Sequence, residues 1–113
     1  RDYSRGVLSA RAKNTDPAFY SPATQMNADE LKIVEIKMRM DGGNEGQLFF
    51  RRTMSTMTEE SSVRFPVFGD GQFHVYTLDM STNRRWRGTI GAIRIDPNSV
   101  QGSEVEIEYV RVR

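Results

Sequence analysis

The stretch from residue 33 to 40, IVEIKMRM, alternates apolar and charged side chains from Val34 onward. Apolar residues occupy its even-numbered positions, and Glu35, Lys37 and Arg39 occupy three of the odd ones. Successive side chains of a β-strand point to opposite faces, so this alternation predicts an antiparallel strand with one face buried and the other in water. The stretch therefore indicates a half-buried strand rather than a helix.

The segments that follow continue the β pattern. Residues 41–46, DGGNEG, tolerate positive φ and predict a turn, and a strand is expected at residues 47–52, so that the two strands form a hairpin. The polar residues 53–62 are expected to form a loop, with a short helix as the alternative. Residues 63–67 alternate again but contain Pro66, which favours an edge strand or a bulge.

Residues 73–80 carry apolar side chains on both faces, a pattern that favours a central strand. Further short strands are expected at residues 8–12, 18–20, 89–95 and 104–112, between turns that contain Asp, Asn, Gly or Pro. This succession predicts an all-β fold, an antiparallel β-sandwich with one core. We expect that core to contain Val34, Ile36, Met38, Leu78, Ile93, Ile95 and Ile107.

Length and composition narrow the class of protein. The 113 residues fit one domain, 1–113, which we expect to be a module of a larger protein with covalently linked neighbours. A net charge of +1 gives no field that attracts a polyanion, so nucleic-acid binding is not expected. No apolar run approaches the roughly 20 residues of a membrane span. The absence of cysteine excludes a disulfide, a thiol nucleophile and a zinc–thiolate site, but leaves the compartment open.

Four segments in the second half of the chain form a recognisable sequence pattern. It runs FHVYTLDM at residues 73–80, WRGTI at 86–90, IRIDP at 93–97 and VEIEYVRV at 105–112. This pattern resembles the carbohydrate-binding-module-like jelly rolls of the galactose-binding-like group, which are appended to bacterial glycoside hydrolases and polysaccharide lyases. The resemblance covers most of the chain from Asp16 onward. It implies a jelly roll, an extracellular or cell-surface location in a bacterium and, at second hand, the binding of a polysaccharide or oligosaccharide.

Sugars are recognised by flat aromatic faces and by planar polar groups, and the chain has both. Trp86 lies among arginines, including Arg85, whose guanidinium suits the carboxylate or sulfate of an acidic sugar. If the strands that carry them share one sheet, their side chains form an aromatic and polar platform. Phe49 and Tyr76 are alternatively core residues, and Trp86 is equally a structural plug. The candidate carbohydrate-binding residues are Gln47, Phe49, Arg51, His74, Tyr76, Arg85 and Trp86.

Calcium is a recurrent structural ion in the group that the chain resembles. It takes about six to eight oxygen ligands. The resemblance therefore implies a structural calcium, although no contiguous motif such as an EF-hand loop is present. The candidate ligands are Asp2, Asp16, Asp79 and Glu108.

A catalytic function is not expected from these residues. His74 is the only histidine and has no nucleophile near it in the sequence, and a glycosidase needs two carboxylates facing each other across the sugar. Glu104, Glu106 and Glu108 share one strand face and are expected to pair with Lys37 and Arg39 across a sheet. We therefore expect a non-catalytic module that targets an attached enzyme or surface protein to a polysaccharide, for which the arginines make an acidic one the candidate. The alternative is a structural or protein-docking module without a sugar ligand.

Overall fold

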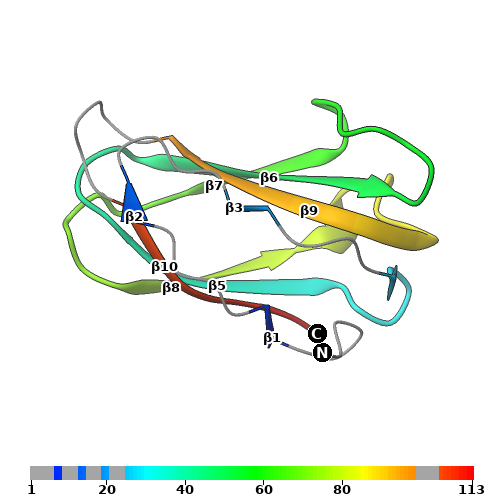
Figure 1. The fold of residues 1–113 in the computed structure, drawn as a ribbon, viewed down its shortest axis with the longest axis horizontal. Coiled ribbons are helices and arrows are strands. Elements are labelled where there is room, and N and C mark those ends of the chain that lie inside the picture. Colours follow the sequence, from blue (N-terminus) through cyan, green and yellow to red (C-terminus); the bar gives the residue numbers. More distant parts are fainter. Residues whose placement is uncertain (1–6, 9–12, 15–18, 21–24, 99–104) are drawn as a thin grey trace.

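The computed structural model describes residues 7–8, 13–14, 19–20, 25–98 and 105–113. These residues form two antiparallel sheets packed face to face, which are the two layers in Figure 1. The predicted β-sandwich, a jelly-roll fold, is confirmed. Among the residues described, no helix is long and apolar enough to cross a membrane.

The first sheet has the strand order β1-β10-β5-β8, and β2 also pairs with β10. Its central pairing joins β5 to β10 and to β8, and every pair in it is antiparallel. A bulge between Ile107 and Tyr109 turns both Glu108 and Tyr109 away from the core. The strands are β1 (Val7–Leu8), β2 (Lys13–Asn14), β5 (Ile33–Met40), β8 (His74–Asp79) and β10 (Val105–Val112).

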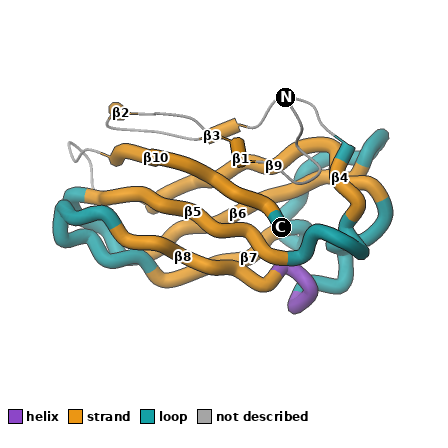
Figure 2. Tube along the Cα trace, turned by 90° about the horizontal axis from the view of Figure 1, so that it is seen from below, coloured by secondary structure: helices purple, strands orange, loops and turns teal. Residues whose placement is uncertain are grey.

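The second sheet has the order β3-β9-β6-β7, and β4 also pairs with β9. A 3-10 turn, η1 (Met80–Thr82), follows β8 and is coloured purple in Figure 2. The strands are β3 (Phe19–Tyr20), β4 (Met26–Asn27), β6 (Glu45–Arg52), β7 (Ser62–Pro66) and β9 (Thr89–Asn98).

The apolar sides of both sheets meet in one core. All seven residues predicted to be buried are there, each with no more than 4% of its surface exposed. The alternation in β5 is complete, because its four even-numbered residues are fully buried and its odd-numbered ones face outward. This arrangement confirms the prediction from residues 33–40.

Two predicted pairings are wrong. Strands β5 and β6 do not form a hairpin, since the turn between them carries the chain from one sheet to the other. Strand β8 is not central but lies at the edge of the described sheet, where Val75 on its outer face is exposed. The edge position of β7, suggested by Pro66, is confirmed, and residues 53–61 form a loop without a helix.

Candidate functional site

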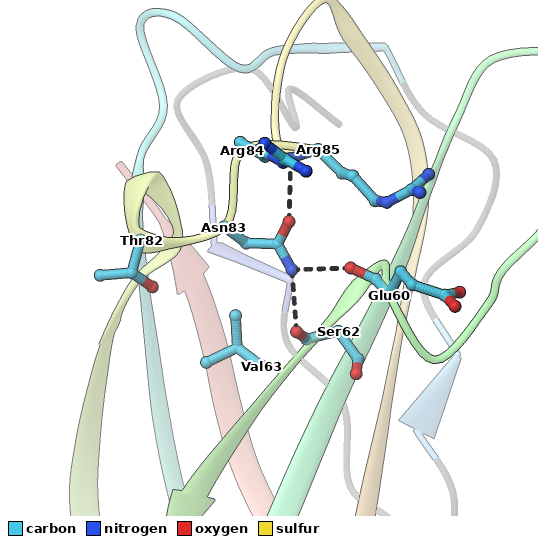
Figure 3. Close-up of a pocket in the computed structure, with 7 residues that line it drawn as sticks. All are labelled: Glu60, Ser62, Val63, Thr82, Asn83, Arg84 and Arg85. Atoms are coloured by element: carbon cyan, nitrogen blue, oxygen red, sulfur yellow. Dashed lines mark hydrogen bonds between the residues drawn. The ribbon is translucent and has the colours of Figure 1, made fainter.

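Two loops at one end of the sandwich enclose an open hollow of about 540 Å³. One loop joins β6 to β7, and the other runs from η1 to β9. The first loop connects two neighbouring strands of one sheet, and the second leads from the other sheet into β9, so the hollow lies at the end of the sandwich rather than on the face of either sheet. Its lining residues, shown in Figure 3, are Glu60, Ser62, Val63, Thr82, Asn83, Arg84 and Arg85.

Local hydrogen bonds fix the second loop. Asp79 caps η1, because its carboxylate accepts hydrogen bonds from the backbone N–H and the hydroxyl of Ser81, at 3.0 and 2.6 Å. The turn then closes on itself, since the N–H of Asn83 donates to the carbonyl of Met80 and the N–H of Trp86 donates to that of Asn83. The backbone that carries Arg84 and Arg85 is thus held at both ends.

Asn83 ties the two loops together. Its Nδ2 donates to the carbonyl oxygens of Glu60 and Ser62, at 3.0 and 2.9 Å, and its Oδ1 accepts a hydrogen bond of 2.9 Å from the N–H of Arg85 (Figure 3). One amide side chain therefore uses both of its functional groups on backbone partners. The hollow is preorganised, and its shape does not depend on a bound ligand.

The hollow carries two cations and one anion. Within the described part of the chain, neither Arg84 nor Arg85 has a carboxylate at salt-bridge distance, so both guanidinium groups retain donors for a ligand. The pKa of Glu60 is lowered, first by its own backbone N–H and then by the hydroxyl of Thr58, with a smaller effect of the positive charge of Arg85. Glu60 is thus ionised at neutral pH, on the same side of the loops as Arg85 (Figure 3).

A second, smaller hollow of about 230 Å³ adjoins the first. Arg85 lines both, so its side chain stands between them. The smaller hollow adds a further guanidinium and several hydroxyl groups to the surface. Besides Arg85, its lining residues are Phe50, Arg52, Ser55, Thr56, Thr58 and Ser61.

Trp86 lies beneath this end of the sandwich and is a structural plug. Only 6% of its surface is exposed, and its indole N–H donates to the carbonyl of Leu31 at 2.9 Å. Its ring packs edge-on against Phe50, with the ring centroids 5.1 Å apart. Of the two roles that the sequence left open, the structure supports the plug, because a buried ring offers no face on which a sugar can stack.

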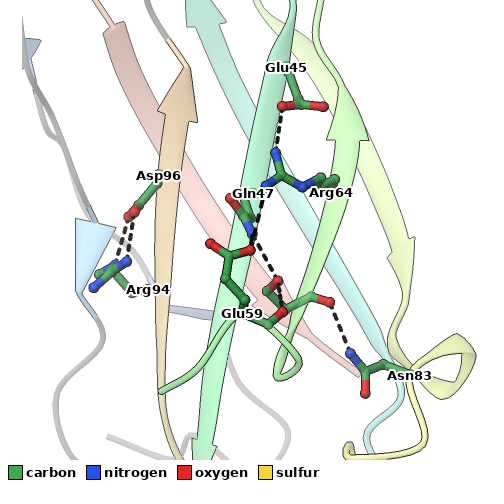
Figure 4. Close-up of polar contacts among 8 residues, drawn as sticks. Glu45, Gln47, Glu59, Arg64, Asn83, Arg94 and Asp96 are labelled. Carbon is green, nitrogen blue, oxygen red and sulfur yellow. Dashed lines mark hydrogen bonds and ion pairs between the residues drawn. The ribbon is translucent and has the colours of Figure 1, made fainter. Parts of the chain in front are cut away.

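Gln47, Phe49 and Arg51 share the outer face of β6, as predicted, but this face is occupied by its own side chains. The guanidinium of Arg94 lies over the ring of Phe49, 4.4 Å from its centroid, and forms two hydrogen bonds of 2.9 Å to Asp96 (Figure 4). Phe49 is consequently buried, but beneath Arg94 on the outer face of β6 and not in the core cluster between the sheets.

The polar groups beside Phe49 are also committed to one another. Gln47 donates to Glu59 and Ser62, at 3.1 and 2.9 Å, and Arg64 pairs with Glu45 at 3.0 Å (Figure 4). Arg51 lies against Gly91, where a Cβ would come within 3.0 Å of the guanidinium. A sugar on this face would have to displace these contacts, whereas the loop hollow offers unpaired donors.

His74 and Tyr76 lie on β8, in the other sheet, so the platform expected from these residues and from β6 is not assembled. Tyr76 is buried, and its hydroxyl accepts a hydrogen bond of 3.0 Å from the N–H of Phe68. His74 contacts Asp70 at the end of the molecule opposite to the hollow. The sequence does not show which sheet a strand joins, and the prediction of one platform is wrong for that reason.

The described residues do not fit a calcium site. They contain no group of three or more acidic or histidine side chains that could hold a metal ion. Asp79 caps η1, and Glu108 pairs with Lys37 at 3.4 Å. On β5, Asp79 lies opposite Ile33, and Glu108 lies beside Lys37. These two positions of β5 are about 13 Å apart along the strand, so Asp79 and Glu108 are too far apart to bind one ion. Asp2 and Asp16 lie outside the described residues, and calcium stays a prediction.

Sequence analysis missed Glu60, Asn83 and the hydroxyl-bearing residues of the smaller hollow. The polar composition of residues 53–62 and 81–88 predicted loops, but nothing in it indicated that the two loops meet. Asn83 was the most informative position that was overlooked, because asparagine in a loop commonly bonds to the nearby backbone. Of the predicted residues, Arg85 alone lines the hollow.

No protein-family model and no curated protein sequence matches the chain. Among solved structures, the fold is similar to a glycoside hydrolase family 43 arabinoxylan arabinofuranohydrolase from Bacillus subtilis in complex with cellotetraose, with a TM-score of 0.56 and 8% identity. The match covers 90% of this chain and 20% of that one, so this chain spans a fifth of the enzyme's length. At this identity the likeness establishes the β-sandwich fold and nothing about a ligand.

Two carbohydrate-binding modules also match, at lower TM-scores. TmCBM61 in complex with β-1,4-galactotriose has a TM-score of 0.48 and 11% identity, over 95% of this chain and 66% of that one. A module from Cellvibrio mixtus lichenase 5A in complex with cellotriose has a TM-score of 0.36 and 13% identity, over 94% and 71% of the two chains.

Proposed function

We propose that this domain is a non-catalytic carbohydrate-binding module whose loop hollow binds a polysaccharide that contains acidic sugars. The observation that carries the proposal is the pair of arginines, Arg84 and Arg85, which line a preorganised hollow and have no carboxylate at salt-bridge distance among the described residues. The β-sandwich fold and its likeness to a fifth of an arabinoxylan arabinofuranohydrolase agree with this function.

The chemistry of the hollow fits an acidic sugar. A guanidinium can form two parallel hydrogen bonds to a carboxylate or sulfate, and such charge-assisted bonds are about twice as strong as neutral ones. The hydroxyls of Thr82, Ser55 and Thr56 can serve as partners for sugar hydroxyls. Because Arg85 lines both hollows, successive sugar units of one chain can bind on either side of it.

A binding role without catalysis suits this surface. Hydrolysis of a glycosidic bond uses two carboxyl groups, about 5 to 9.5 Å apart, on either side of the bond. Of the described residues that line the two hollows, only Glu60 carries a carboxylate. We propose that the module acts outside the cell and holds an attached domain near its polysaccharide, which raises the effective concentration of substrate.

Binding to acidic and neutral polysaccharides, measured by affinity electrophoresis and calorimetry, tests the proposal. We expect Arg85→Ala to weaken binding to polygalacturonate by about tenfold or more, since it removes a charged anchor from the centre of the surface. Arg87→Ala is the matched control, because Arg87 is an exposed neighbour that lines neither hollow. Equal affinities of the two variants would contradict the placement of the site.

Two further arms separate the alternatives. Loss of binding in EDTA and its recovery with calcium would support the expected ion. Failure of every acidic polysaccharide to bind would overturn the acidic-sugar proposal. If no sugar of either kind bound, a structural or protein-docking module would be the better interpretation. Release of reducing ends from a bound polysaccharide would contradict the non-catalytic role.

A further inference from the structure

An exposed aromatic residue marks the opposite end of the sandwich. Phe68 lies in the loop between β7 and β8, and 63% of its surface is exposed. A single exposed apolar residue is common on protein surfaces, so the exposure of Phe68 gains meaning only from how the ring is held and what surrounds it.

The loop that carries Phe68 is fixed from several directions. The N–H of Phe68 donates to the buried hydroxyl of Tyr76 at 3.0 Å, and the preceding residue, Val67, is buried in the core. The carbonyl of Gly69 accepts from Gly42 at 3.0 Å, and the N–H of Gly71 donates to Met40 at 2.8 Å. These bonds anchor the loop to the neighbouring turn, so the ring of Phe68 projects from a fixed backbone.

Gly69 shows how close this anchoring is. A Cβ at this position would lie 2.3 Å from the carbonyl oxygen of Gly43, a backbone atom that a rotamer change cannot move. The two loops therefore touch through their backbones. This close packing leaves the side chain of Phe68 on the outside rather than between the loops.

Polar groups flank the ring. The imidazole of His74 lies beside Phe68, with ring centroids 5.0 Å apart and an interplanar angle of 46°. Its Nε2 is 3.0 Å from both carboxylate oxygens of Asp70, which is half exposed. Asp70 also accepts a hydrogen bond of 2.9 Å from the N–H of Gln72, and this bond, followed by the contact with His74, lowers the pKa of its carboxyl. Asp70 is thus an oriented anion that can still accept hydrogen bonds from solvent.

We propose that Phe68, Asp70 and His74 form a second carbohydrate-binding site, specific for neutral sugars. The ring of Phe68 offers a flat apolar face for the C–H side of one pyranose, and the carboxylate of Asp70 accepts hydrogen bonds from its hydroxyls. The negative charge of Asp70 disfavours acidic sugars, so this end and the arginine-lined hollow select different ligands. The ring of Phe68 by itself is too small for a stable protein interface, which buries about 800 Å² on each partner.

Calorimetry of the whole domain with cellotetraose and β-1,4-galactotriose at millimolar concentration tests this proposal. We expect at least one of these neutral oligosaccharides to bind and Phe68→Ala to weaken it about tenfold or more. Val75→Ala is the matched control, since Val75 is an exposed apolar residue on the outer face of β8. Circular dichroism and urea denaturation establish that both variants are folded.

The second variant, Asp70→Asn, removes the charge but keeps the size of the side chain. It should weaken neutral sugars and relieve the discrimination against acidic ones. The site is refuted by a lack of binding of both neutral oligosaccharides, or by binding that Phe68→Ala leaves unchanged. These results leave the arginine-lined hollow standing, because the Arg85→Ala experiment with polygalacturonate does not depend on Phe68.

Discussion

Trp86 illustrates how a residue with two plausible roles is resolved by what it contacts. The sequence placed a tryptophan among arginines at the start of a strand, a context that suits a sugar platform and a core plug equally well. The contacts that decide between them come from Leu31 and Phe50, which are distant in the sequence. Burial of this kind depends on tertiary neighbours, and no local pattern around Trp86 encodes it.

Trp86→Phe should therefore change stability much more than binding. The substitution leaves the carbonyl of Leu31 without its indole donor and opens a small cavity, at a cost of about 2–4 kcal/mol. The affinity for acidic sugar should stay within about twofold, because the ring lines neither hollow. Urea denaturation followed by circular dichroism checks the first expectation, since the variant has no tryptophan fluorescence. A large loss of affinity in the folded variant would mean that Trp86 contributes to sugar binding after all.

The elements show which part of the pairing a sequence can predict. The glutamates of β10 pair with the cations of β5 as expected, with Glu106 next to Arg39 and Glu108 next to Lys37, each at 3.4 Å. Glu104, the third glutamate of that predicted set, lies outside the described residues. The alternation of each strand gives its inward and outward faces, so opposite charges on facing strands are predictable once the strands are neighbours. The sequence does not predict that β5 and β6 lie in different sheets, because a glycine-rich turn can connect two strands of a hairpin or two strands of different sheets equally well.

A charged network across β5 and β10 gives the clearest dependence on pH. The hydroxyl of Tyr109 donates to Glu35 at 2.6 Å, and the guanidinium of Arg113 lies 3.2 Å from the same carboxylate. These contacts, the tyrosine first, lower the pKa of Glu35, and the carboxylate in turn raises the pKa of Tyr109. The ionised form of Glu35 is therefore favoured by folding.

Glu35→Gln should destabilise the domain at neutral pH and matter less in acid. A lowered folded-state pKa contributes stability above the ordinary value of 4.5, and this contribution is lost as the pH falls through the folded-state value. The denaturation midpoints of the wild type and the variant should consequently converge below about pH 4.5. Glu30→Gln makes the same chemical change at an exposed position and should show no such convergence. A pH-independent difference would mean that the charge of Glu35 is not what stabilises the fold.

At the scale of the whole molecule, the two proposed sites stand at opposite ends of the sandwich. The length of the strands sets the distance between the two sites, and along β8 alone His74 and Asp79 are about 17 Å apart. The net charge of +1 also hides a local contrast, with arginines at one end and an oriented aspartate at the other. A net charge gives only the sum over the chain, so composition could not reveal two ends of different character.

Sites this far apart should act independently and allow one molecule to join two polysaccharide chains. The effects of Arg85→Ala and Phe68→Ala on binding free energy should add, because the two residues share no partner and lie well beyond 10 Å from each other. In a mixture of an acidic and a neutral polysaccharide, the wild type should form crosslinks that raise the viscosity. Each single variant should lose that crosslinking while it still binds the polysaccharide of its intact end. Crosslinking that survives either substitution would show that one end alone engages both chains, and the two-site arrangement would then be wrong.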